Sequence, residues 1–136
     1  MAASIALEKK CLRLVGNVYS SGGPVVANTF IKRSSTGWIP CAAGDLPEAF
    51  AISGATYAAS GDNAFQYTNE DGIVIEITDS GSAAVNALAY LTSASAINSA
   101  VNGYYPIGIV QMWSPGKTGF KRVQVYFKHT QTVYST

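Results

Sequence analysis

Charged side chains are scarce in this sequence. Asp, Glu, Lys and Arg make up 12% of its 136 residues, the hydrophobic set reaches 48%, and the formal net charge is +1. Nucleic-acid-binding proteins concentrate an excess of Lys and Arg on one face, so this balance argues against a nucleic-acid partner. A surface with so few charges consists largely of Ser, Thr, Asn, Gly and apolar atoms, which suits lasting contact with another protein.

Groups for catalysis and metal binding are equally few. His129 is the only histidine, and it stands in a polar tail. A Ser-His-Asp or Cys-His site needs that ring held beside a nucleophile and an orienting group. The acidic loop at 68–72 lacks the alternating acidic ladder of a calcium loop and is better explained as a turn. We therefore expect no enzyme activity, no catalytic residue, no metal site, no cofactor and no small-molecule substrate.

Cysteines and long apolar runs are also in short supply. Cys11 and Cys41 fit neither a zinc-ribbon spacing nor a dense disulfide framework. We interpret them as small buried apolar residues in a reducing compartment, with a single disulfide as the alternative. No stretch reaches the roughly 18 uninterrupted apolar residues of a membrane span, and the N-terminus does not read as a secretory signal. The expected location is the cytoplasm, with no membrane partner.

What the sequence does contain is a series of short β-rich runs separated by Gly-containing turns. Strands are predicted at 11–19, 25–32, 38–41, 49–52, 63–68, 73–78, 107–113 and 120–128. Roughly eight or nine short strands of this kind predict an all-β domain, either a compact antiparallel β-barrel or a jelly-roll-like sandwich.

Three local features refine this prediction. Asp71-Gly72 is typical of a tight hairpin between the strands on either side, and Pro40 places its strand at a strand end or sheet edge. The alanine-rich segment 80–100 could begin a helix at Ser80 or Ser82, but its polar interruptions favour strand, loop and strand.

The charges are segregated along the chain. Lys and Arg stand near both ends, whereas every charged residue between 45 and 79 is acidic. If the first and last strands lie together, the molecule would carry a basic side and an acidic side, which favours docking on copies of itself or on a partner of opposite charge. Chance in a small number of charges is the alternative.

Exposed aromatic residues are the remaining candidates for recognition. Trp38 could form a stacking platform or an interface contact, or it could lie in the core. Tyr104 and Tyr105 precede a strand in a predicted turn, where aromatic rings are candidates for an interface.

The order of these features resembles the small bacteriophage capsid decoration, or cement, proteins. The segment V-A-N-T-F-I (26–31) is followed by WIPCAAGD (38–45), an A-x-G-D turn (59–62) and I-G-I-V (107–110). The likeness covers about residues 11–128 and rests on turns and small residues. The sequence departs from the family pattern at Asn86, where a glycine is common, and in the length of its tail.

The resemblance implies a homotrimer that binds the outer surface of an expanded icosahedral head and bridges neighbouring capsomers. The partner would be the major capsid protein, and the location the virion surface after assembly in the bacterial cytoplasm. Residues 1–10 would form a flexible N-terminal arm that becomes ordered on the shell, residues 11–128 one domain and residues 129–136 a tail. Candidate interface residues are Lys9, Lys10, Val25, Val26, Phe30, Trp38, Tyr104 and Tyr105.

A second function from another class remains open at this point. Trp38 with Tyr104 and Tyr105 could bind sugars in a carbohydrate- or receptor-binding β-sandwich of the head-fibre type.

Overall fold

The computed structural model describes residues 3–5, 14–17, 24–34, 37–55, 64–79, 84–98, 106–113 and 119–127. These residues form eleven strands and no helix, so the all-β prediction is confirmed. No helix among them could therefore cross a membrane. The strands are β1 (Ala3–Ile5), β2 (Leu14–Asn17), β3 (Phe30–Ser34), β4 (Gly37–Pro40), β5 (Ala49–Ala51), β6 (Ala64–Thr68), β7 (Ile73–Asp79), β8 (Leu88–Ser93), β9 (Ala96–Asn98), β10 (Pro106–Trp113) and β11 (Phe120–Val125).

Five strands close into a barrel in the order β7, β11, β10, β8 and β9, with β9 returning to pair with β7. All these pairings are antiparallel except the short parallel contact of Thr78 and Asp79 with β9. The sequence of β7 explains its central place, because its β-branched isoleucines alternate and point into the barrel. On the edge of β7 opposite β11, β1 pairs in antiparallel register with residues 75–77.

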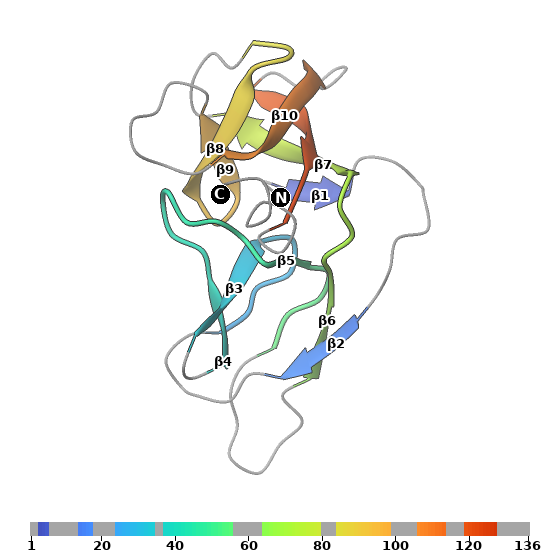
Figure 1. The fold of residues 1–136 in the computed structure, drawn as a ribbon. Coiled ribbons are helices and arrows are strands. Elements are labelled where there is room, and N and C mark those ends of the chain that lie inside the picture. Colours follow the sequence, from blue (N-terminus) through green and yellow to red (C-terminus); the bar gives the residue numbers. More distant parts are fainter. Residues whose placement is uncertain are drawn as a thin grey trace, which may run out of the picture.

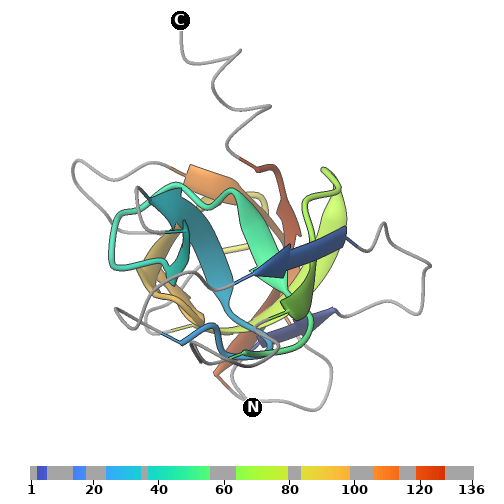
Figure 2. The ribbon, with the colours of Figure 1, turned by 90° about the horizontal axis from the view of Figure 1, so that it is seen from below.

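The other five strands form a second sheet in the order β2, β6, β5, β3 and β4. Its two outer strands approach one another, because a Cβ added at Gly16 of β2 would stand only 3.0 Å from the indole Nε1 of Trp38 on β4. The barrel and the second sheet are stacked: Figure 1 shows one above the other, and the view from below in Figure 2 superimposes them.

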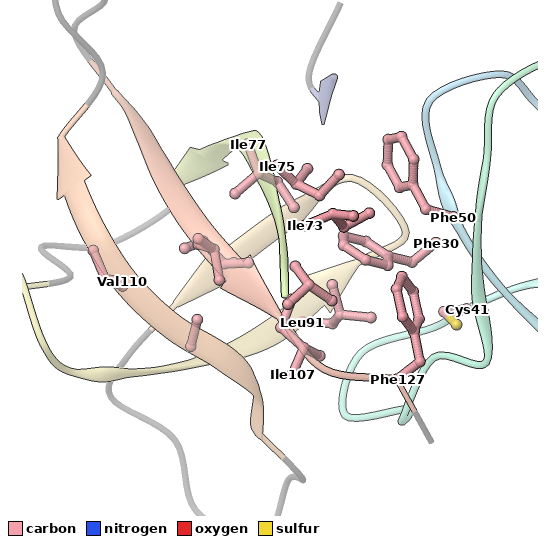
Figure 3. Packing of buried hydrophobic residues seen from close by; sticks show 14 residues of the cluster. Phe30, Cys41, Phe50, Ile73, Ile75, Ile77, Leu91, Ile107, Val110 and Phe127 are labelled. Carbon is pink, nitrogen blue, oxygen red and sulfur yellow. The ribbon is translucent and has the colours of Figure 1, made fainter. Parts of the chain in front are cut away.

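A shared core joins the two sheets. Phe30 and Phe50 come from the second sheet, yet they point toward the barrel isoleucines, and the ring of Phe30 also packs against that of Phe127 (Figure 3). The ring centroids of Phe30 and Phe50 are 5.1 Å apart in an edge-to-face arrangement. Their chain neighbours Ile31, Ala49 and Ala51 point the other way, into a second buried cluster. Strands β3 and β5 are therefore buried on both faces and belong to both cores.

The strand predicted at 25–32 begins later than expected. Val25 makes only an isolated bridge with Ala55, and Asn28 has a φ of 64°, a left-handed conformation that interrupts an extended strand. Regular pairing starts at Phe30. Pro40 does lie at the end of an edge strand, so that prediction is confirmed.

The hairpin predicted at Asp71-Gly72 is wrong, although the turn itself is present. Gly72 has a φ of 88°, but β6 before it belongs to the second sheet and β7 after it belongs to the barrel. The turn instead carries the chain from one sheet to the other. Asp71 Oδ1 accepts a hydrogen bond of 2.7 Å from the backbone N–H of Phe127, which ties this crossing to the end of β11.

The described part of the segment 80–100 contains two strands that pair with each other, β8 and β9, joined by a short turn, which confirms strand, loop and strand. Residues 3–5 of the expected flexible arm form β1 on the barrel, so this part of the arm is already paired in the chain alone. The tail 129–136 lies outside the described residues.

Candidate interaction surface

The structure separates the residues predicted for an interface. Val25 and Phe30 are buried in the two cores, so their side chains are not part of an exposed surface. Val26 is 54% exposed and does lie on the surface. Four further candidates lie outside the described residues: Lys9, Lys10, Tyr104 and Tyr105.

Trp38 belongs to the interior of the second sheet. It is 8% exposed, and its ring centroid lies 4.8 Å from that of Tyr67 and 6.3 Å from that of Phe65. The Arg33 guanidinium carbon lies 5.3 Å from the ring centroid, a cation–π contact. Because protein atoms surround the ring, Trp38 does not offer the open face that stacking of a sugar requires.

The four basic side chains that the structure describes all lie beside acidic residues from the middle of the chain. These ion pairs bring together the segments of opposite charge, so the described residues do not form the separate basic and acidic sides that the sequence suggested. The N–O distances are 2.8 Å for Lys32–Asp45, 3.4 Å for Arg33–Glu48, 3.2 Å for Lys121–Asp79 and 3.7 Å for Arg122–Glu76.

The turn after β4 shows how this pairing shapes local structure. Asp45 Oδ2 accepts a 2.7 Å hydrogen bond from the N–H of Ala42, while Gly44 adopts a φ of 79°. Partial burial raises the pKa of Asp45, but hydrogen bonds from Lys32 and Ala42, with the charge of Lys32, outweigh it and hold the pKa below 3.8. The carboxylate is thus a charged structural acceptor.

The most distinctive surface feature is a pair of apolar residues on the outside of the barrel. Leu88 of β8 and Ile109 of β10 stand directly opposite one another and are 47% and 36% exposed. The same row continues across the sheet through Gln124 of β11 to Val74 of β7. This row carries no charged side chain.

The turn that precedes β8 presents a third exposed apolar side chain. The N–H of Ala87 donates to the carbonyl oxygen of Ala84 (3.1 Å), and Asn86 has a φ of 72°, as the third position of a type II turn requires. Val85 at the second position is 45% exposed. We call Val85, Leu88 and Ile109 the barrel face.

A further exposed apolar residue lies at the opposite end of the molecule. Val15 on β2 is 67% exposed and pairs in register with Gln66 of β6, which is also exposed. Figure 1 shows β2 at the lower end of the second sheet, far from β8 and β10 at the top.

The described residues contain no group of three or more His, Cys, Asp or Glu side chains that could hold a metal ion. His129 lies outside them.

Sequence reasoning missed the barrel face for identifiable reasons. Ile109 stands in an apolar run, and irregular register between β10 and β8 turns it outward while its neighbours Ile107 and Val110 stay buried. Leu88 lies in a segment whose period is ambiguous. Val15 carried a signal, because alternation puts it on the same side of its strand as Arg13.

Comparisons with known proteins identify no relative: no family model, no curated protein and no solved structure matches the chain.

Proposed function

We propose that this protein is a bacteriophage head decoration protein, which binds the outer surface of an expanded capsid and bridges neighbouring capsomers. The observation that carries the proposal is the placement of exposed apolar residues at two opposite ends of one body. Val15 lies at the end of the second sheet, and Leu88 and Ile109 lie on the barrel. A bridging protein needs two separate contact surfaces, and an exposed apolar side chain at each end would supply the apolar centre of such a contact.

The shared core makes this body suitable for bridging. Because Phe30 and Phe50 are buried among barrel residues, a force on the second sheet is transmitted to the barrel through packed side chains. A stiff body holds its two contact surfaces at a fixed separation. Binding then costs little conformational entropy at either end.

Symmetry would supply the affinity. In a homotrimer, three copies of a modest contact act on one symmetric site of the shell, so weak single contacts combine through effective concentration. Binding to the assembled shell stabilises it by mass action, since the protein binds the intact lattice and not the separated subunits. The major capsid protein is the proposed partner, and the virion surface the proposed location.

The test uses expanded heads that lack this protein, prepared from the same source. Added protein should co-sediment with the heads to a fixed stoichiometry and raise their melting temperature. Val15→Lys should weaken binding at least about tenfold, because it places a charge in an apolar contact. Ala43→Lys, which adds the same charge in the exposed turn after β4, is the matched control. Absence of binding by the native chain would refute the proposal.

A further inference from the structure

The edge of β7 that faces away from β11 is shared by two short strands. The N–H of Asp79 donates to the carbonyl oxygen of Gly119, just before β11 (2.8 Å). Backbone groups alternate in direction along an antiparallel strand, so those of Glu76 and Thr78 face the opposite edge, which we call the outer edge. There β9 meets Thr78 and β1 meets Glu76, each over only two or three residues. The ladder with β11, in contrast, runs from Ile73 to Thr78 without a break.

Strand β1 covers the part of the outer edge that β9 leaves open (Figure 1). Ser4 stands opposite Glu76, and this is the one position of β1 at which both strands direct their backbone groups toward each other. So short a pairing contributes little free energy. Strand β1 can leave the edge without opening the barrel, because β9 still pairs with β7 and completes the ring.

The residues of β7 define what kind of strand fits the outer edge. Ile75 and Ile77 are fully buried, and Ile5 and Ala3 occupy the positions opposite them. Glu76 between them is only 8% exposed. Paired residues lie on the same side of a sheet, so an acidic residue opposite Glu76 would bring two carboxylates together. The edge therefore fits an extended segment with two apolar residues on either side of a neutral or basic one.

We propose that the outer edge of β7 is a strand-docking site, and that an extended segment of the major capsid protein displaces β1 from it. The pairing with β1 shows that the edge accepts such a segment. Strand β1 ends opposite Ile75, so a longer strand also pairs with Val74, whose backbone groups face the same edge. Backbone hydrogen bonds then supply the affinity, and the alternation of side chains supplies the specificity.

The identity of the partner rests on the proposed function, whereas the docking site does not. Binding of a peptide to the purified chain needs no capsid, so the site can be confirmed while binding to heads fails, and the reverse. The exposed apolar residues of the second sheet and of the barrel keep the roles proposed for them.

The first experiment uses a fluorescent peptide with the sequence of residues 2–9, AASIALEK, added to the full chain. Ser4→Pro in the chain removes the N–H that stands opposite Glu76 and so releases β1 from the edge. The peptide should bind this variant at least about tenfold more tightly than the native chain, in which β1 competes. Ser4→Ala, which keeps the N–H, is the matched control and should behave as the native chain does.

Altered peptides test the chemistry of the site. The peptide with Ser4→Pro should not bind, because it cannot complete the ladder. The peptide with Ser4→Glu should bind at least about threefold more weakly than the parent, because its carboxylate meets that of Glu76. The same Ser4→Glu change in the full chain weakens β1 by repulsion and is a second variant in which the affinity for the parent peptide should rise.

The second experiment uses expanded heads that lack this protein. Ser4→Pro should bind them more tightly than the native chain by about the factor measured with the peptide, because the capsid segment no longer displaces β1. An excess of the peptide should lower this binding, since both occupy the same edge.

Folding of each variant is checked by its thermal unfolding transition. Folded Ser4→Pro and Ser4→Glu chains that do not bind the peptide would overturn the docking site. Weaker binding of Ser4→Pro to heads, or binding that the peptide does not reduce, would overturn the capsid segment as the occupant. A mass in solution that differs between Ser4→Pro and the native chain would show that β1 pairs with another copy, and would equally overturn the proposal.

Discussion

Cys41 shows how the fold controls the chemistry of a single side chain. It is buried in the shared core, and its backbone N–H donates to the carbonyl oxygen of Phe30. Burial, with a smaller contribution from the carboxylate of Asp45, raises the pKa of the Cys41 thiol from 9.0 to about 12. The thiolate is the reactive form, so Cys41 is a packing residue at neutral pH. Its predicted burial is confirmed, whereas Cys11 lies outside the described residues.

Cys41 should resist alkylation in the native protein at pH 8 and react readily in denaturant. Mass spectrometry of the peptide that contains Cys41 after an iodoacetamide pulse measures this directly. Equal labelling rates in the native and the denatured chain would contradict the burial.

The same thiol should make stability depend on alkaline pH. The folded pKa of about 12 lies above the unfolded value of 9.0, so the stabilisation is complete below about pH 9. It is lost as the pH rises toward 12, because the unfolded chain releases its proton first. Urea unfolding of the native chain and of Cys41→Ala, compared between pH 8 and pH 10, isolates the effect. The loss should be smaller in the variant.

For single residues, the sequence predicted the chemical character of the surface better than it predicted which side chains are buried. Its low charge indicated a surface rich in apolar and small polar groups, and exposed Val15 and Leu88 agree with that expectation. The sequence did not predict whether the Trp38 side chain is buried or exposed. Either face of a short strand can be buried when the sheet curls. That curl depends on the approach of Gly16 to Trp38, between strands distant in sequence.

Among the elements, the pair of β10 and β11 depends on one glycine. A Cβ added at Gly108 would overlap the carbonyl oxygen of Gln124 and would lie 2.9 Å from the carbonyl carbon. These are backbone atoms of the neighbouring strand, so no side-chain rotation relieves the clash. The close approach of the two strands therefore requires glycine here.

Gly108→Ala should lower the free energy of unfolding by about 3 kcal/mol, because the two strands must separate to admit the methyl group. Urea denaturation gives the value. Gly119→Ala is the control, since a Cβ there meets nothing within 4 Å and the cost comes from its φ of 80° alone, about 1 kcal/mol. A Gly108→Ala variant as stable as the control would contradict the packing described.

Strand positions could be read from the sequence, but strand partners could not. Turn chemistry identified Asp71-Gly72 correctly, yet the sheet to which each flanking strand belongs is set by distant contacts such as that of Asp71 with Phe127. In the same way, the sequence predicted a strand at 120–128, in which Val123, Val125 and Phe127 are buried. It did not reveal that these side chains share a core with the rings of Phe30 and Phe50.

On the scale of the whole molecule, the barrel and the second sheet are coupled by core residues and by backbone contacts. The N–H of Phe30 donates to the carbonyl oxygen of Ala94 in the turn between β8 and β9 (2.8 Å), and the N–H of Gly44 donates to that of Leu91 (3.0 Å). Neither sheet can lose its structure without exposing apolar surface of the other. The molecule therefore should unfold as one cooperative unit.

Native-state hydrogen exchange should give similar opening free energies for amides of β3 and of β7. Phe30→Ala should lower both by about 4 kcal/mol, because it removes a buried ring that belongs to both sheets. Val26→Ala, at an exposed position nearby in the chain, should change neither by more than about 0.5 kcal/mol. Loss of protection in β3 alone would show two independent units.

Closure of the barrel limits how copies of the protein can aggregate at high concentration. In the ring of β7, β11, β10, β8 and β9, each of β8, β10 and β11 has a hydrogen-bonded neighbour on both sides, so the strands that carry Leu88 and Ile109 expose no free ladder. Strands with free ladders recruit further strands without limit and lead to fibres. Because these strands are already paired on both sides, another chain can contact them only through side chains, which prevents growth by strand addition at this part of the molecule.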